Sequence, residues 1–583
     1  MNTDRADRLL TIAERTGFRQ TGRTDEVVRL CQAYAEAWPR EVRTVEFGRS
    51  AENRPMLALV ACARDPRSVP LLMIQAGIHP GESDGKDAGF IALRELLSGT
   101  AAPAALQKIA LLFVPAFNVD GHERFGRWNR PNQNGPDATG WRTTAHNLNL
   151  NRDYTKADTP EMQAMLRLIN EWDPLVYADL HVTDGADFEP DISIQVEPIN
   201  QGDPNLYGIG GILRDSLIDR LAAEGSLPLP FYPDLARSDD PSSGFLLSVY
   251  SPRFSTGYPP TRNRFTVLVE THSWKDYATR VRVTRNTIVA LAQLLAEHGS
   301  AWREAAQRAD RATGGLIGTQ IPLDYSSGWR ETGKAGAEAA TPASDAGTMI
   351  DFRGYAYTRT VSPISGAPVV TYDPKTPQIW RVPFRDQVEP SLRTTVPRAY
   401  VVPSAYAELI AAKFELHGIG FKRTAGTIEK AALEAFRATK VTFSQAPFEG
   451  RFRAQFEGTW RPEAADIAAG SLIVPTAQPL ARLVVALLEP QAPDSLAAWG
   501  FFNAHFEQKE HMEAYVAEQI ARGMLDRNPD LAKQFKERLS ADSAFAADPA
   551  ARLQFFLRRH ESWDERYNLY PIHRTHVDIA SMY

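Results

Sequence analysis

The order of apolar segments between residues 69 and 299 limits the folds open to this chain. Short apolar runs of strand length alternate there with longer stretches whose apolar residues recur at helical spacing. Such alternation is typical of a mixed, largely parallel sheet with helices on both faces, so we predict an α/β fold. The expected strands are 69–78, 109–117, 174–182 and 265–272, and the expected helices are 86–99, 159–172 and 284–299.

The segments before residue 69 extend this predicted domain toward the N-terminus. Residues 24–38 place apolar side chains on one helical face, and Pro39 ends the pattern. Residues 42–50 and 55–64 are two apolar runs separated by a polar turn, which indicates adjacent strands. We therefore assign residues 1–305 to one domain.

The rest of the chain is long enough for further structure, because single cores stop growing near ~250–300 residues and this chain has 583. Residues 306–350 are rich in Gly, Ala, Ser and Thr, which predicts a linker-like segment. Residues 351–583 are predicted to form a mixed α+β C-terminal accessory region, strand-rich to about 485 and then mainly helical. We identify no catalytic cluster in this region, and its role as packing, lid or partner surface stays open.

Charge and hydropathy exclude two classes of partner. The 65 basic and 71 acidic residues are spread along the chain, with a net charge of −6, so no nucleic-acid binding is expected. No apolar run approaches the ~18 residues of a membrane span. The N-terminus lacks the apolar core of a signal peptide. We expect a soluble protein of unknown compartment, cytoplasmic as the sequence stands and periplasmic or secreted if a leader was removed.

The cysteine count limits the covalent and metal chemistry. Only Cys31 and Cys62 occur, which excludes a disulfide framework and a zinc site made of several cysteines. A single bridge between the two cysteines stays open.

Polar side chains follow the predicted strands of the first domain. His79 and Glu82 come directly after the strand at 69–78, His181 ends the strand at 174–182, and Glu270 lies near the end of the strand at 265–272. In open α/β sheets the ligand crevice lies outside the carboxyl ends of the strands. We therefore expect these side chains, with Asn118 and Asp120 after the strand at 109–117, to converge on one edge of the sheet.

Two imidazoles and one carboxylate form the three-ligand set that catalytic zinc uses, with a fourth position left open. Pro80 and Gly81 bend the chain between His79 and Glu82, so that both can reach one ion. A His-x-x-Glu pair alone is common, and a single histidine at a strand end is more often a hydrogen-bonded structural residue. Glu270 adds a carboxylate suited to activating water, so the set predicts one Zn²⁺ ion per chain and a hydrolytic reaction.

Six short motifs occur in order along the first domain. They are HPGE at 79–82, FNVDG at 117–121, RWNRPN at 127–132, NLNRDY at 149–154, DLH at 179–181 and VETH at 269–272. In this order they resemble the motifs of the zinc metallocarboxypeptidases, that is, the carboxypeptidase A-like metallopeptidases of the bacterial type, here with a long C-terminal extension. The resemblance covers roughly residues 24–300 and implies that family's fold.

The resemblance implies a role for each matching residue. It makes Glu270 the general base and acid, and Arg127 the residue that stabilises the developing oxyanion. It makes Asn151 and Arg152 the pair that holds the terminal carboxylate of the substrate, which a guanidinium grips with two hydrogen bonds. The implied zinc ligands are His79, Glu82 and His181.

Two positions depart from the family pattern near the carboxylate-binding pair. Asn149 stands where the family commonly has an aspartate that orients a zinc histidine, and we expect its amide oxygen to accept the imidazole N–H. Asp153 replaces the usual asparagine after the pair, and we expect its carboxylate to weaken or steer carboxylate capture by Arg152.

Two assignments stay open on spacing alone. The family's mobile tyrosine has two candidates here, Tyr250 and Tyr258. Arg130 and Arg142 are rivals to Arg127 for the oxyanion role.

The predicted function is a zinc-dependent carboxypeptidase that removes a C-terminal residue. Its partner would be a peptide or a small amide with a free carboxylate, with no nucleic acid and no membrane insertion. Two alternatives remain: a zinc-dependent amidase or deacylase acting on N-acyl amino acids, and a non-catalytic binding module with a relic site.

Overall fold

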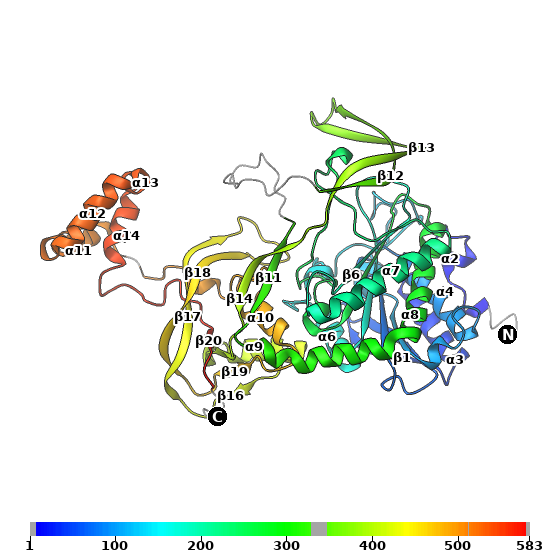
Figure 1. Cartoon of the computed structure of the whole chain (residues 1–583), viewed down its shortest axis with the longest axis horizontal. Coiled ribbons are helices and arrows are strands. Elements are labelled where there is room, and N and C mark those ends of the chain that lie inside the picture. Colours follow the sequence, from blue (N-terminus) through cyan, green and yellow to red (C-terminus); the bar gives the residue numbers. More distant parts are fainter. Residues whose placement is uncertain (1–6, 328–346, 511, 579–583) are drawn as a thin grey trace.

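The computed structural model describes residues 7–327, 347–510 and 512–578. Its centre is an eight-stranded mixed sheet with the strand order β1-β2-β4-β3-β5-β10-β6-β7 (Figure 1). The strands are β1 (Val42–Arg49), β2 (Pro55–Ala61), β3 (Leu71–Ala76), β4 (Ala110–Val114), β5 (Val176–Val182), β6 (Ile192–Glu197), β7 (Pro228–Leu229) and β10 (Phe265–Thr271).

The middle of this sheet is parallel, as predicted. Strands β4, β3, β5 and β10 run parallel to one another, whereas β2 is antiparallel to both of its neighbours, β1 and β4, and β6 is antiparallel to β10. Every residue of β3, β4 and β5 is buried, so helices and loops cover both faces. The predicted α/β fold class is confirmed.

Five main helices pack around the sheet. Thr159 caps α6 by accepting a hydrogen bond from the Met162 N–H, and Gly99 ends α4 in the left-handed conformation. The helix predicted at 284–299 is longer than expected, because buried side chains such as Trp302 and Ala309 continue its apolar face. The helices are α3 (Thr24–Ala37), α4 (Asp84–Ser98), α6 (Pro160–Trp172), α7 (Tyr207–Ala223) and α8 (Tyr277–Ala312).

The segment predicted to be linker-like contains regular structure at both ends. Residues 306–312 belong to α8, and β11 (Gln320–Ser326) pairs with β14 (Glu389–Thr395). Residues 328–346 of this predicted segment lie outside the described residues. The long hairpin of β12 (Thr348–Val361) and β13 (Pro368–Arg385) follows and projects from the body of the molecule (Figure 1).

A second large sheet forms beyond the hairpin. It has six strands in the order β16-β19-β15-β20-β17-β18, and α9 (Ser404–His417) and α10 (Ala481–Leu488) accompany it. Buried apolar residues from Leu9 to Ile572 form one continuous core, so this sheet packs on the first. The strands are β15 (Ala399–Val402), β16 (Lys422–Arg423), β17 (Ile428–Phe443), β18 (Ala454–Ile467), β19 (Leu472–Pro475) and β20 (His573–Thr575).

Four helices near the C-terminus stand apart from both sheets (Figure 1). They enclose a small apolar core of their own, which includes Leu531, Phe545 and Phe555. In the described ranges no helix has the length and apolar character needed to cross a membrane. Cys31 and Cys62 are both buried free thiols. The helices are α11 (Ala514–Arg527), α12 (Pro529–Ala541), α13 (Ser543–Ala547) and α14 (Pro549–Leu557).

Candidate metal centre and active site

The three predicted ligands lie together at the carboxyl ends of β3 and β5. One ligand atom from each of His79, Glu82 and His181 lies within 4.8 Å of the others, and all three residues are buried. After β3 the chain turns tightly through Pro80 and Gly81, and the Glu82 N–H donates to the His79 carbonyl at 2.9 Å. Throughout the described part of the chain this is the one group of His, Cys, Asp and Glu side chains with such geometry.

Both imidazoles turn their Nδ1 atom toward the Glu82 carboxylate. His79 Nδ1 lies 3.1 Å from Glu82 Oε1, and His181 Nδ1 lies 2.9 Å from Glu82 Oε2. The outer nitrogens have their own acceptors: His79 Nε2 lies 3.1 Å from Asn149 Oδ1, and His181 Nε2 lies 2.6 Å from Asp179 Oδ2. An acceptor on the outer nitrogen orients a metal-binding imidazole. The expectation that Asn149 accepts the histidine N–H is confirmed.

Two polar atoms at this centre have no hydrogen bond. His79 Nδ1 is close to Glu82 but not in hydrogen-bonding geometry, and it has no other partner among the described residues. Glu270 Oε2 is also buried without a hydrogen-bond partner among the residues that the structure describes. A buried polar atom without a partner costs free energy, and a cation beside these lone pairs would remove that cost. Two imidazole nitrogens and a carboxylate suit zinc, so the residues present fit this ion.

His79 and Glu82 are held in the protonation states that a metal needs. Burial lowers the pKa of His79 to about 4, so its imidazole is neutral and able to bind a metal. Burial opposes the ionised form of Glu82, but His79, Arg130 and His181 outweigh it and hold the pKa of Glu82 well below its usual range. Burial likewise opposes charge on His181, yet Asp179 and Glu82 raise its pKa well above the ordinary value. A bound metal would take the place of that imidazole proton.

Glu270 stands beside this group on the neighbouring strand. The parallel register of β5 and β10 pairs Glu270 with His181. Burial, together with the negative charge of Glu82, raises the pKa of Glu270 to about 8. A bound divalent cation would lower that pKa toward neutrality, where a carboxylate can both accept and return a proton.

The three candidate arginines occupy different places. Arg127 is exposed, and its guanidinium carbon lies 5.3 Å from the centre of the Trp128 ring. Arg130 and Arg142 instead contact Glu82 Oε1, at 2.9 and 3.3 Å. The structure therefore brings Arg130 and Arg142 to the predicted ligands and leaves Arg127 at the surface.

Arg130 and Arg142 differ in how much of each guanidinium is already engaged. Arg130 also donates to the backbone carbonyls of Val182 and Thr183, and its side chain is 9% exposed. Its stem crosses Gly81, where a Cβ atom would come within 2.4 Å of Arg130 Cγ. Arg142 is 37% exposed and makes its one side-chain contact, within the part of the chain that the structure describes, with Glu82. Arg142 is thus the better placed of the two to bind a further oxygen.

Asn151 and Arg152 lie on the short turn η2 (Leu150–Arg152), close to the predicted ligands. Asn149 Oδ1, which accepts from His79, also accepts from the Asn151 N–H at 2.9 Å. Arg152 stacks on the Phe254 ring, with 4.3 Å between its guanidinium carbon and the ring centre. It forms no salt bridge to any described residue. Burial and the neighbouring Arg142 lower its pKa to about 10, so Arg152 is an unpaired cation at neutral pH.

The contacts of the Asp153 carboxylate, which was expected to weaken or steer carboxylate capture by Arg152, lie away from that arginine. The carboxylate is fully buried and turned toward the start of α6, where it accepts from Lys156 Nζ at 2.6 Å and from the Thr159 N–H at 2.9 Å. Lys156, three residues after Asp153, neutralises this charge in place of Arg152. Asp153 thus organises the turn after the pair.

The two tyrosine candidates differ in their surroundings. Tyr258 is fully buried, and its hydroxyl lies 2.8 Å from His417 Nδ1, so it belongs to the packing between the two sheets. Tyr250 is half-buried, and burial together with the charge of Glu270 raises its pKa. Tyr232, which the sequence did not single out, has its pKa raised by the same two causes. Tyr250 and Tyr232 therefore both lie within electrostatic range of Glu270.

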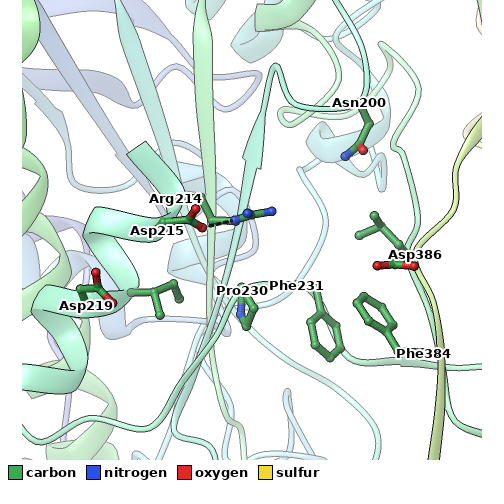
Figure 2. Close-up of a pocket in the computed structure, with 10 residues that line it drawn as sticks. Asn200, Arg214, Asp215, Asp219, Pro230, Phe231, Phe384 and Asp386 are labelled. Carbon is green, nitrogen blue, oxygen red and sulfur yellow. Dashed lines mark hydrogen bonds and ion pairs between the residues drawn. The ribbon is translucent and has the colours of Figure 1, made fainter. Parts of the chain in front are cut away.

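A separate groove of about 460 Å³ lies between α7 and the base of the hairpin (Figure 2). Figure 2 shows Phe231 and Phe384 on one side, with Arg214 and Asp215 of α7 across from them. None of the predicted catalytic, carboxylate-binding or metal-binding residues lines this groove. It is therefore not the site of the predicted chemistry.

Comparison with known proteins agrees with this site. Residues 27–188 match the Peptidase_M14 family model, described as zinc carboxypeptidase. The chain is 22% identical over 473 residues to Carboxypeptidase 2 of Trichophyton rubrum, covering 78% of each chain, and equally similar to Carboxypeptidase 2 of Trichophyton tonsurans.

Two solved structures give weaker overall matches. A metallo-carboxypeptidase from Burkholderia cenocepacia has a TM-score of 0.36 at 17% identity, over 47% of this chain and 70% of that one. Carboxypeptidase A from Helicoverpa armigera has a TM-score of 0.35 at 18% identity, over 49% of this chain and 74% of that one. Over residues 27–188 the chain thus matches the zinc carboxypeptidase family model, and it is similar to curated carboxypeptidases over most of its length, which supports a zinc metallopeptidase.

Proposed function

We propose that this chain is a zinc-dependent carboxypeptidase that hydrolyses the C-terminal peptide bond of its substrate, with His79, Glu82 and His181 as the metal ligands. The observation that carries the proposal is the convergence of this buried ligand group with the unpaired carboxylate oxygen of Glu270. Zinc held by such a set supplies a Lewis acid that polarises a carbonyl and lowers the pKa of water.

Glu270 would move the proton in this reaction. Its Oε2 atom has no hydrogen bond to a described residue, so it is free to take a proton from the attacking water. The same oxygen then returns the proton to the nitrogen of the leaving amine. The Oε2 atom is itself buried, which keeps it away from competing bulk water, although Glu270 as a whole is half-buried.

Arg142 is the residue that we assign to the developing oxyanion. Negative charge grows on the carbonyl oxygen only as the bond to water forms, so a fixed cation there favours the transition state over the substrate. Arg142 has the unoccupied donors for this role, whereas Arg130 is held by Glu82 and two backbone carbonyls.

Arg152 is the residue that we assign to the substrate's terminal carboxylate. Its guanidinium is half-buried, is stacked on Phe254, and forms no salt bridge to a described residue. A free carboxylate would neutralise this charge with two parallel hydrogen bonds. This contact would restrict cleavage to the last residue of a peptide.

The test compares three substrate classes before and after metal removal. Blocked dipeptides with a free carboxylate should be cleaved, the same dipeptides with an amidated C-terminus should not, and N-acyl amino acids should be poorer substrates. Phenanthroline should abolish cleavage and added Zn²⁺ should restore it. Cleavage that survives chelation, or a preference for N-acyl amino acids over dipeptides, would contradict the proposal.

A further inference from the structure

The turn that carries Asn151 and Arg152 is held from outside its own domain. The segment from Asn149 to Asp158 receives hydrogen bonds or ion pairs from the C-terminal region at the Asn149 N–H, at Thr155, at the carbonyls of residues 156 and 157, and at Asp158. These contacts span the whole segment, so its conformation depends on the region after residue 350. The contributing residues are Lys413, His417, Glu449, Arg451 and Trp499.

Glu449 makes the contact closest to the site. Its Oε2 atom accepts a hydrogen bond from the Asn149 N–H at 2.7 Å, the short distance typical of a charged acceptor. The two residues are 300 positions apart in the chain.

The loop between β17 and β18 presents Glu449 rigidly. The backbones of Phe448 and Arg451 exchange two hydrogen bonds, of 2.9 and 3.1 Å, which close the turn. Glu449 itself has a φ of 50°, in the left-handed region that a residue with a side chain adopts only when its surroundings hold it there. Arg451 anchors the turn to Asp158 through hydrogen bonds of 2.7 and 2.9 Å.

Asn149 connects Glu449 to the metal ligand His79 and to the turn that carries Asn151 and Arg152. Its side-chain oxygen lies 3.1 Å from His79 Nε2 and 2.9 Å from the Asn151 nitrogen. A shift of the Asn149 backbone would therefore move the acceptor that orients His79 and the turn that presents Arg152.

We infer that Glu449 is a positioning residue through which the C-terminal region sets the metal ligand His79 and the pair Asn151 and Arg152. The part of this inference that concerns substrate rests on the proposed function, whereas the part that concerns His79 stands on the hydrogen bonds alone. The carboxylate of Glu449 also interacts electrostatically with Arg152, and the experiment separates this charge effect from the hydrogen bond.

The experiment uses full-length protein and four variants. Glu449→Ala removes the acceptor, Glu449→Asp withdraws it, and Glu449→Gln keeps a carbonyl oxygen at the same place without the charge. Glu457→Ala is the matched control, because Glu457 is an exposed residue on the adjoining strand that pairs with Lys440. Zinc affinity is measured by competition with a chelator, and kcat and KM are measured on a blocked dipeptide at saturating zinc.

Loss of the acceptor should weaken zinc binding by roughly 3- to 10-fold, less than the 10- to 100-fold of a direct partner of a ligand. It should raise KM by roughly 10-fold, near the upper value for one neutral hydrogen bond, and leave kcat within about threefold. Glu449→Gln should restore both values, and Glu457→Ala should change neither. If Glu449→Ala does not fold, Glu449→Asp carries the same prediction.

Two results would overturn the inference. One is unchanged zinc affinity and unchanged KM in Glu449→Ala. The other is a Glu449→Gln variant as impaired as Glu449→Ala, which would assign the effect to charge on Arg152. If the unsubstituted protein cleaves no dipeptide, the proposed function fails, and the zinc measurement alone still decides the role of Glu449 toward His79.

Discussion

Replacement of Arg142 by alanine tests the assignment of the oxyanion residue. Arg142 contacts Glu82 Oε1 at 3.3 Å with one of its nitrogens, which leaves other donors for a substrate oxygen. Loss of one preorganised donor to an oxyanion costs about 2.7–4 kcal/mol. Because 37% of this side chain is exposed and water screens its charge, we expect about 2–3 kcal/mol, which corresponds to a fall in kcat of about 30- to 150-fold.

The assay is steady-state cleavage of a blocked dipeptide at saturating zinc. Arg127→Ala is the matched control, since Arg127 is exposed and stacks only on its neighbour Trp128 among the described residues. We expect it to keep kcat within about twofold, as surface substitutions do. Measured zinc content separates loss of catalysis from loss of metal. A larger fall in kcat for Arg127→Ala than for Arg142→Ala would refute the reasoning and restore Arg127 to the oxyanion role.

Three further substitutions test other parts of the account. Glu270→Gln should lower kcat by on the order of 10²–10⁴-fold with zinc still bound, because the amide cannot take a proton; full activity in a pH series would contradict this. Arg152→Ala should raise KM for free-carboxylate dipeptides by roughly 10-fold or more, and an unchanged KM would remove its assignment. His417 is buried and neutral, with its pKa lowered to about 3, below the ordinary value of an unfolded histidine. The unfolded chain therefore binds a proton that the folded chain does not. The free energy of unfolding should fall by up to about 1.4 kcal/mol per pH unit as pH drops from about 6 to 4, and His417→Gln should flatten that slope in thermal unfolding; an unaltered slope would exclude His417 as its source.

The sheet and the convergence of the candidate ligands could be predicted from local sequence. The strand ending before His79 and the strand containing His181 are long apolar runs, and their parallel pairing through β3 and β5 brings the two histidines together. The tight turn at Pro80 and Gly81 is likewise a local signal. These residues were predictable because each depends on a few neighbours in the chain.

The arginines could not be assigned in the same way. Arg127, Arg130 and Arg142 all lie in the connection between β4 and α6, which has little regular structure. In such a segment spacing does not determine which side chain turns inward. Packing of the Arg130 stem on Gly81 settles its direction, and that contact joins two loops.

Local sequence also could not predict the contacts of Asp153 or the hydrogen bond between Glu449 and Asn149. Asp153 faces Lys156 because both are buried together at the start of α6, a burial that the motif does not reveal. Glu449 reaches Asn149 from the second sheet, across 300 residues. The sequence signal there is Gly450, which indicates a turn and does not identify a partner.

The position of the metal is the most direct test of the central claim. Crystals of the full-length protein grown with Zn²⁺ should show, in an anomalous difference map at the zinc absorption edge, one ion bound by Nδ1 of His79, Nδ1 of His181 and the carboxylate of Glu82. An ion at another place, or no ion at this centre in zinc-saturated crystals, would contradict the account.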